Sequence, residues 1–212
     1  MTNNQAIADY VHDVFGAEDE ALRRARDAPG QNGMPAISVR PEEGRVLQFL
    51  ARAIGARKIV EIGTLAGYSG IWLARALPDG EGKLYTIEAD PKHAAVARES
   101  FVRAGVSDRV EIREGEAAAM LAALRAEGPF DFCFIDADKD RYPAYLDWAL
   151  ENLRPGGIVA AHNALRGGRI VAPENDADHI VRRFNARMAD DPRLVSILIP
   201  LGDGIVAGLV QG

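Results

Sequence analysis

Acidic side chains stand at the ends of three apolar runs in the sequence. Glu61 is the next-to-last residue of the run Lys58–Ile62, and Glu88 is the last residue of the run Lys83–Glu88. Asp136 directly follows a third run, Phe130–Ile135. Short apolar runs bounded by glycine or charged residues are typical of buried strands. The carboxyl ends of parallel strands meet at one edge of a sheet, where ligands bind. We therefore expect the three carboxylates to lie close together and to contact a polar ligand.

A glycine-rich segment, Glu61–Gly70, begins at the first of these runs. Glycine permits positive φ angles and lets a ligand approach the backbone closely. The spacing of Gly63, Gly67 and Gly70 differs from the G-x-G-x-x-G pattern of dinucleotide sites. In such a site Glu61 would also lie near the pyrophosphate. The segment argues against NAD and favours a cofactor with positive charge, such as the amino group and sulfonium of S-adenosylmethionine.

The next two strand ends carry residues suited to a nucleoside. Glu88 can accept hydrogen bonds from both hydroxyls of a ribose, and its charge would reject a 2′-phosphate. Gly115-Glu116-Ala117 follows the third predicted strand, where backbone amides could meet an adenine edge. Each feature alone is weak, but their order along the chain indicates an adenosyl cofactor.

The elements that must position these residues follow from the alternation of apolar and polar segments. Strands separated by helices indicate a mainly parallel sheet with helices on both faces. The predicted fold class is α/β, a doubly wound, seven-stranded, Rossmann-like sheet whose closing hairpin adds an antiparallel C-terminal strand. The predicted strands are 58–62, 83–88, 109–113, 130–135, 157–161, 194–199 and 204–210, and the predicted helices between them are 69–77, 91–104, 117–126, 142–153 and 176–188.

The chain is predicted to form a single domain over residues 1–212. Its length of 212 residues and hydrophobic fraction of 48% suit one ordinary core. Residues 1–40 are expected to form an N-terminal helical cap: helical spacing covers the first 28 residues, Pro29–Gly33 breaks it, and Met34–Val39 is extended. Pro41 then opens another helix.

Charge and composition disfavour several classes of partner. The net charge of −6 gives no general attraction to phosphate backbones or anionic lipid, so nucleic acid is disfavoured. The polar N-terminus is unlike a signal peptide, and apolar stretches are shorter than the ~20 residues of a membrane span. The single cysteine, Cys133, lies in an apolar run and is expected to be buried. We expect a cytoplasmic protein that binds no membrane.

With the segment after the fourth strand included, the chain resembles the cation-dependent O-methyltransferases. This family comprises catechol and caffeoyl-CoA O-methyltransferases and their small bacterial relatives, which are class I S-adenosylmethionine-dependent enzymes. The resemblance spans nearly the whole chain, and the run Asp136–Asp140 with the downstream Asn163 is its most specific part. The other matching segments are Met34–Val39, Glu61–Ser69, Gly156-Gly157 and Leu201–Gly204.

The resemblance implies a role for each matching residue. Lys139 would be the base that takes the proton of the acceptor hydroxyl, with Asp136 beside it. A phenol with a pKa near ~10 is a poor nucleophile at neutral pH, so loss of its proton matters. Asp136 and Asn163 would bind a divalent metal. The residues implied at the S-adenosylmethionine site are Val39, Glu61, Gly63, Thr64, Ser69, Glu88, Ala117 and Asp136.

One residue departs from the family pattern. The usual pair after the fifth strand is Asp-Asn, whereas this chain has His162-Asn163. An imidazole suits manganese, cobalt, iron or zinc better than magnesium. Either the set Asp136, His162 and Asn163 takes a transition metal instead of magnesium, or metal binding is weak or absent.

The leading hypothesis is an O-methyltransferase acting on a small catechol-like acceptor, with metal assistance, in a homodimer. A tRNA hydroxyuridine O-methyltransferase is an alternative, for which a basic surface near Asp136 would be needed. A cofactor-binding protein with lost or metal-independent catalysis is the other alternative, suggested by His162. Acceptor specificity is expected in the N-terminal segment and in the loop 164–175, where arginines could meet an anionic acceptor. The arginines considered are Arg166, Arg169, Arg182 and Arg183.

Overall fold

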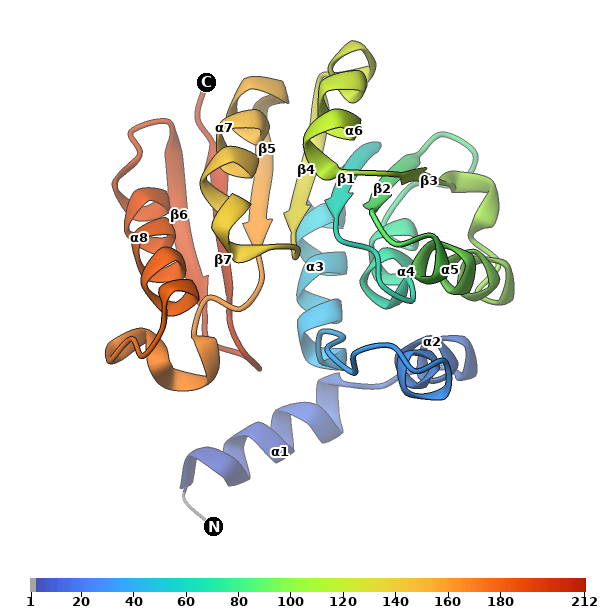
Figure 1. Ribbon diagram of the computed structural model, residues 1–212, viewed down its shortest axis with the longest axis horizontal. Helices are drawn as coiled ribbons and strands as arrows, with labels where there is room; N and C mark the ends of the chain where they lie inside the picture. The colour runs from blue at the N-terminus through green and yellow to red at the C-terminus, as the bar shows by residue number, and fades with distance from the viewer. Residues whose placement is uncertain (1–2) are drawn as a thin grey trace.

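The alternating pattern of the sequence forms one sheet, of strand order β3-β2-β1-β4-β5-β7-β6 (Figure 1). The computed structural model describes residues 3–212. Within that part of the chain the sheet has seven strands, as predicted. Their bounds are β1 Lys58–Ile62, β2 Lys83–Glu88, β3 Val110–Glu114, β4 Phe130–Ile135, β5 Leu153–Ala161, β6 Leu194–Ile199 and β7 Ile205–Val210.

The sheet is parallel except at one strand. β1, β2, β3, β4 and β5 pair in parallel, and β7 runs antiparallel to both β5 and β6. The strand order reverses between β1 and β4, which are neighbours in the middle of the sheet. The predicted doubly wound α/β fold with an antiparallel C-terminal strand is confirmed, and a ligand site is expected beside the reversal.

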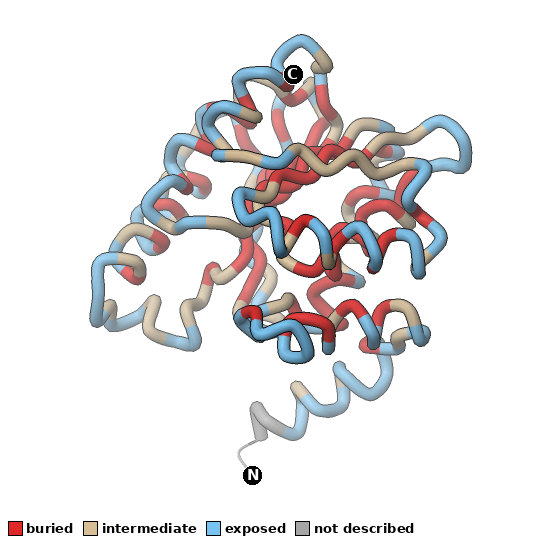
Figure 2. Tube along the Cα trace, turned by 45° about the vertical axis from the view of Figure 1, so that its right-hand side comes forward, coloured by how far each residue is buried: buried red, intermediate tan, exposed pale blue. Residues whose placement is uncertain are grey.

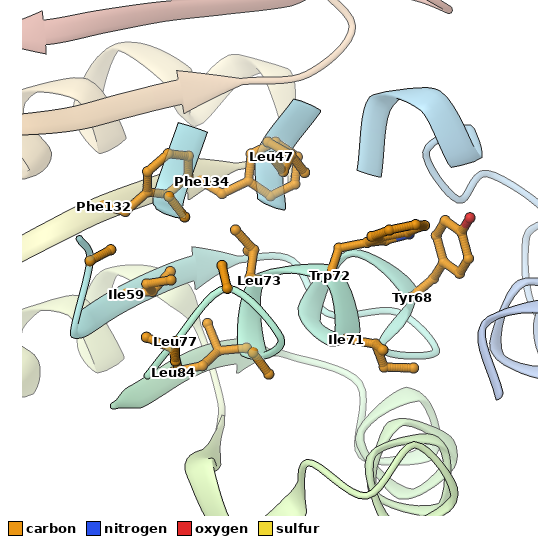
Figure 3. Packing of buried hydrophobic residues seen from close by; sticks show 14 of the residues in the cluster. Leu47, Ile59, Tyr68, Ile71, Trp72, Leu73, Leu77, Leu84, Phe132 and Phe134 are labelled. Atoms are coloured by element: carbon orange, nitrogen blue, oxygen red, sulfur yellow. The ribbon is translucent and has the colours of Figure 1, made fainter. Parts of the chain in front are cut away.

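Helices cover both faces of the sheet because the buried strands alternate their side chains between two cores. Ile59 packs in the core that includes residues of α3, α4 and α5 (Figure 3). Its neighbour Val60 packs in the other core, with residues of α6, α7 and α8. Eight α-helices are described: α1 Asn3–Phe15, α2 Glu20–Gln31, α3 Pro41–Ala53, α4 Tyr68–Ala74, α5 Pro91–Arg103, α6 Ala117–Leu124, α7 Tyr142–Asn152 and α8 Asp176–Asp190.

The N-terminal segment differs from the sequence expectation at one point. Pro29 and Gly30 were predicted to break the chain, but α2 continues through both and ends at Gln31. The turn closes only afterwards, where the backbone amides of Asn32 and Met34 donate to the Pro29 carbonyl. In Figures 1 and 2, α1 projects from the body of the molecule and most of its surface is exposed. None of the helices in residues 3–212 is long and apolar enough to cross a membrane.

Candidate active site

A cavity of about 490 Å³ opens at the carboxyl ends of β1, β2 and β4. It lies beside the reversal of strand order, where the topology predicts a ligand. The structure brings most of the predicted site residues to its wall. Those that line it are Val39, Gly63, Thr64, Ser69, Glu88, Ala117, Asp136, Lys139 and Asn163.

The loop after β1 passes very close to the loop after β4. Gly63 has a φ of +98°, and a Cβ there would collide with the carbonyl oxygen of Asp136. Gly67, with a φ of +84°, begins α4. Glycine is required at both positions, since other residues rarely adopt this backbone. The close approach of Gly63 to Asp136 holds the backbone of the loop along the cavity wall.

Glu61 lies directly behind this loop, with none of its surface exposed. Its Oε1 accepts a hydrogen bond from Ser69 Oγ at 2.6 Å, and its Oε2 accepts one from Thr86 Oγ1 at 2.6 Å. Burial raises the pKa of Glu61 to about 7, although both hydroxyls act in the opposite direction. Glu61 is therefore a buried acid poised to ionise when positive charge enters the cavity.

Glu88 ties three backbone segments together at the end of β2. Its Oε2 accepts from the amides of Thr64, at 3.2 Å, and Leu65, at 2.8 Å. Its Oε1 accepts from the amide of Asp90 at 3.0 Å. A carboxylate has about four lone-pair positions, so the three bonds leave room for about one ligand hydroxyl. Glu88 can hold the glycine loop and bind a ribose at once.

Asp136 and Lys139 form an ion pair at the cavity wall. Lys139 Nζ lies 3.1 Å from Asp136 Oδ1, and it also donates to the carbonyl of Ala137 at 3.1 Å and to Tyr142 Oη at 2.7 Å. The Tyr142 hydroxyl in turn donates to the carbonyl of His162 at 3.2 Å. These contacts fix the Lys139 amine where a ligand hydroxyl could reach it.

His162 is held between two carboxylates. Its Nδ1 is 3.2 Å from Asp136 Oδ2, and its Nε2 is 3.0 Å from Glu43 Oε1. Burial opposes a charge on His162, but Asp136 and Glu43 outweigh it and raise the pKa of His162 to about 10. Burial likewise opposes the charge on Asp136, yet His162 and then Lys139 lower the Asp136 pKa below its ordinary value. Each ring nitrogen of His162 therefore faces a carboxylate oxygen that favours a proton on it.

Asn163 turns its side-chain amide toward the C-terminal hairpin. It adopts a φ of +59°, and its Nδ2 donates to Asp203 Oδ2 at 2.8 Å. The other oxygen of Asp203 accepts from the backbone amide of Gly167. The hydrogen bond between Asn163 and Asp203 links the end of β5 to the turn between β6 and β7.

The predicted metal ligands do not fit a divalent cation in this arrangement. Both ring nitrogens of His162 and both oxygens of Asp136 already face oppositely charged partners. Across residues 3–212, no group of three or more His, Cys, Asp or Glu side chains is placed to hold a metal ion. The expectation of a metal set at these residues is not supported by their geometry.

Sequence reasoning missed Glu43 and Tyr142. Glu43 contacts a residue 119 positions away, so local spacing could not pair them. A signal was nevertheless present, because Glu43 shares a helix face with Leu47 and Ala51, which are both fully buried. An acid on the apolar face of an amphipathic helix must find a buried partner.

The loop 164–175, which contains Arg166 and Arg169, is held in place by a buried acid of α8. Asp178, which has no exposed side-chain surface, accepts from Arg166 Nε at 2.9 Å and from Arg169 Nε at 3.0 Å. The loop contains the 3₁₀ helix η4, Arg166–Val171. Arg166 lines the cavity. Part of this loop is therefore a wall of the site.

Known proteins resemble the chain over nearly its whole length. A family model described as O-methyltransferase matches residues 12–210. A catechol O-methyltransferase of Niastella koreensis is 45% identical over 99% of this chain and 100% of its own length. One of Mycobacterium tuberculosis is 46% identical over 95% of this chain and 94% of its own length.

Solved structures agree with the sequence comparison. The O-methyltransferase of Bacillus cereus, in complex with SAH, has a TM-score of 0.87 and 40% identity, with 97% of each chain covered. The O-methyltransferase TomG of Streptomyces achromogenes, in complex with SAM, has a TM-score of 0.88 and 37% identity, with 100% of each chain covered. The resemblance predicted from the motifs is confirmed, and this chain belongs to the O-methyltransferase family.

Proposed function

We propose that the protein transfers the methyl group of S-adenosylmethionine to a hydroxyl oxygen of a small aromatic acceptor with adjacent hydroxyls. The observation that carries the proposal is the single cavity whose wall joins the glycine loop and Glu88 to Asp136 and Lys139. This wall would set a cofactor site beside a proton-accepting group. The solved relatives with bound SAH and SAM support the choice of cofactor.

The residues around the cavity suit each part of that cofactor. Gly63 and Ser69 would face its methionine end, with Glu61 behind them to balance the amino group and sulfonium. Glu88 would accept the ribose hydroxyls, and Ala117, the first residue of α6, would lie by the adenine. When bound, the cofactor supplies a methyl group on sulfur: the new O–CH₃ bond forms as the S–CH₃ bond breaks, and sulfur keeps the electron pair as a thioether.

Lys139 would take the proton of the acceptor hydroxyl at its Nζ, after the ammonium of the resting Asp136–Lys139 ion pair has released a proton to solvent. A phenol and a lysine amine have similar ordinary pKa values, about 10 and about 10.4, so the transfer is close to balanced. The ammonium that results already has three acceptors in place: Asp136 Oδ1, the Ala137 carbonyl and Tyr142 Oη. The rest of the rate gain comes from holding the oxygen in line with the methyl group.

The acceptor class is supported by the relatives. Both curated relatives described above are named catechol O-methyltransferases, and a phenol with a neighbouring hydroxyl offers two oxygens to the Asp136–Lys139 pair. The proposal is tested by measuring transfer of a labelled methyl group to catechol, to a monohydroxy phenol and to transfer RNA. We expect monomethylated catechol as the main product. Methylation of RNA alone would replace this proposal with the tRNA alternative.

We further propose that the protein is a homodimer joined through α1. Apolar side chains on this projecting helix are half or more exposed, and burying them against a second copy would remove that surface from water. They are Ile7, Tyr10, Val14 and Phe15. Light scattering during size exclusion should give twice the 22.9 kDa chain mass. Replacing Ile7 and Tyr10 by serine should then yield a monomer, and a wild-type monomer would exclude the proposal.

A further inference from the structure

Four charged side chains form a row of contacts that ends at the cavity wall with Asp136 and Lys139. Glu43 contacts His162, His162 contacts Asp136, and Asp136 contacts Lys139, over distances of 3.0, 3.2 and 3.1 Å. The Glu43 side chain is 1% exposed and that of His162 5%. Two acids and two bases balance one another, which offsets the cost of burying Glu43 and His162 fully and Asp136 and Lys139 in part.

The hydrogen bonds define what His162 can offer. An ionised carboxylate only accepts hydrogen bonds, so each ring nitrogen that faces one must carry a proton. Glu43 is itself fixed, because its oxygens accept from the amide of Arg40 at 2.7 Å and from that of Asp203 at 2.8 Å. The turn at Gly202 closes over it so tightly that a Cβ there would collide with the Glu43 carboxyl group.

To bind a metal, His162 would need a ring nitrogen that carries no proton. Histidine binds a metal through an unprotonated nitrogen, and here both nitrogens donate to acids. A divalent cation would also add two positive charges to a cluster that is already balanced. To free a ligand nitrogen, the ring would have to abandon a buried carboxylate.

We infer that this chain binds no divalent cation at Asp136, and that the Glu43–His162 pair instead holds Asp136 and, through it, Lys139 in place for methyl transfer. The inference rests on the proposed methyl transfer to a hydroxyl. Glu43 and His162 are positioning residues: they act on the acceptor only through Asp136. Asp136 has one oxygen on each basic partner, Oδ2 on His162 and Oδ1 on Lys139.

The direct test measures metal binding apart from activity. Mn²⁺ is titrated into wild-type protein saturated with S-adenosylhomocysteine, and the free ion is followed by electron paramagnetic resonance. We expect no stoichiometric Mn²⁺ site. The rate of labelled-methyl transfer to catechol should be the same, within about twofold, after exhaustive chelation as after addition of magnesium or manganese. One tightly bound Mn²⁺ per chain, or activity that is lost on chelation and restored by a metal, would overturn the inference.

A double substitution tests which residues exclude the metal. Glu43→Gln with His162→Asp removes the buried cation and supplies a carboxylate next to Asp136 and Asn163. This variant should bind one Mn²⁺ and need it for activity. If it binds S-adenosylhomocysteine, and so is folded, but takes no Mn²⁺, the role assigned to Glu43 and His162 is wrong.

Nuclear magnetic resonance of the wild type tests the same point without depending on the double variant. At neutral pH the His162 ring should show two hydrogen-bonded N–H protons, assigned by their loss in His162→Asn. Glu43→Gln should shift the Nε2 proton. Glu42→Gln is the matched control, since Glu42 is a buried acid on the same helix that contacts His12 instead, and it should leave both protons unchanged. A ring with one N–H proton would contradict the inference.

Failure of the proposed function has a different signature. It would appear as S-adenosylhomocysteine binding without transfer to any catechol, with or without metal. The Mn²⁺ titration and the nuclear magnetic resonance experiment would still test metal binding and the state of the His162 ring independently of activity.

Discussion

Glu61 shows how a single buried acid can couple the cofactor site to pH. It has no exposed surface and is held by two hydroxyls instead of a base. Burial raises its pKa from 4.5 to about 7. A cation in the cavity would favour the ionised form, and loss of that cation would favour the protonated one.

The stability of the unliganded protein should therefore fall as pH rises from about 4.5 to 7. In this interval the folded state keeps the Glu61 proton and the unfolded chain has released it, so the folded state binds more protons. Urea unfolding at pH 5 and pH 8 measures the effect, and Glu61→Gln is expected to flatten the Glu61 part of the profile. Binding of S-adenosylmethionine should be tighter at pH 8 than at pH 5. An equal affinity at both would argue against a charge on Glu61 in the complex.

Substitutions at Lys139 can separate its proposed role as a general base from the effect of its positive charge. Lys139→Ala should lower turnover by ~10²–10⁴-fold, the usual value of a general base, with little change in cofactor affinity. Lys139→Arg is the discriminating variant, because arginine keeps the positive charge but does not give up its proton. It should be nearly as inactive as Lys139→Ala with catechol. Both losses should shrink for a nitrated catechol that is already ionised at the assay pH, and activity of the arginine variant near wild type would instead assign Lys139 an electrostatic role.

At the scale of elements, the loop containing η4 forms part of the cavity wall through Arg166. Two glycines with positive φ, Gly167 at +62° and Gly168 at +89°, let it double back. Asp178, in the first turn of α8, then accepts hydrogen bonds from the Nε atoms of both Arg166 and Arg169. One buried acid thus orients two arginines, of which Arg166 faces the cavity.

We expect Arg166 to favour acceptors that carry a carboxylate. Arg166→Ala should raise the KM for 3,4-dihydroxybenzoate roughly tenfold to a hundredfold, the worth of one charge-assisted hydrogen bond. The KM for catechol should change little. Arg169→Ala is the matched control, because Arg169 shares Asp178 but stands outside the cavity wall, and it should affect both acceptors alike. Parallel losses for both acceptors in Arg166→Ala would leave Arg166 with a purely structural role.

The elements themselves were largely predictable, and their partners were not. β1, β2, β4 and β6 begin and end at the predicted residues, because β-branched and other apolar residues dominate each of these runs. β5 begins earlier than expected, at Leu153, which pairs with Phe130 before the register shifts. Most residues of the cavity wall could also be predicted, because they lie at strand ends and in the glycine-rich loop. The Glu43–His162 contact did not, because it joins the first turn of α3 to the end of β5 and depends on the three-dimensional packing of the C-terminal turn.

At the scale of the whole molecule, the site depends on segments from across the chain. Val39 precedes α3, the glycine loop follows β1, Ala117 begins α6, and Asn163 follows β5. Asp203, in the turn before β7, ties the last of these to the hairpin. A ligand that fills the cavity therefore contacts several elements at once, and its binding should stabilise the fold as a unit.

Thermal unfolding should report that coupling directly. At about 100 times Kd, S-adenosylmethionine or S-adenosylhomocysteine should add roughly 2.7 kcal/mol, which for a chain of this size is a rise in Tm of roughly 5–10 °C. NAD should give no shift, since Glu61 and the glycine spacing disfavour a pyrophosphate. Glu88→Ala should weaken cofactor binding by roughly 1.5–3 kcal/mol through lost charge-assisted hydrogen bonds. Its matched control is Glu114→Ala, because Glu114 is the register partner of Glu88 at the end of β3 but is exposed and paired with Arg98. An undiminished shift in Glu88→Ala would place the ribose elsewhere, and stabilisation by NAD but by neither adenosyl compound would overturn the cofactor assignment altogether.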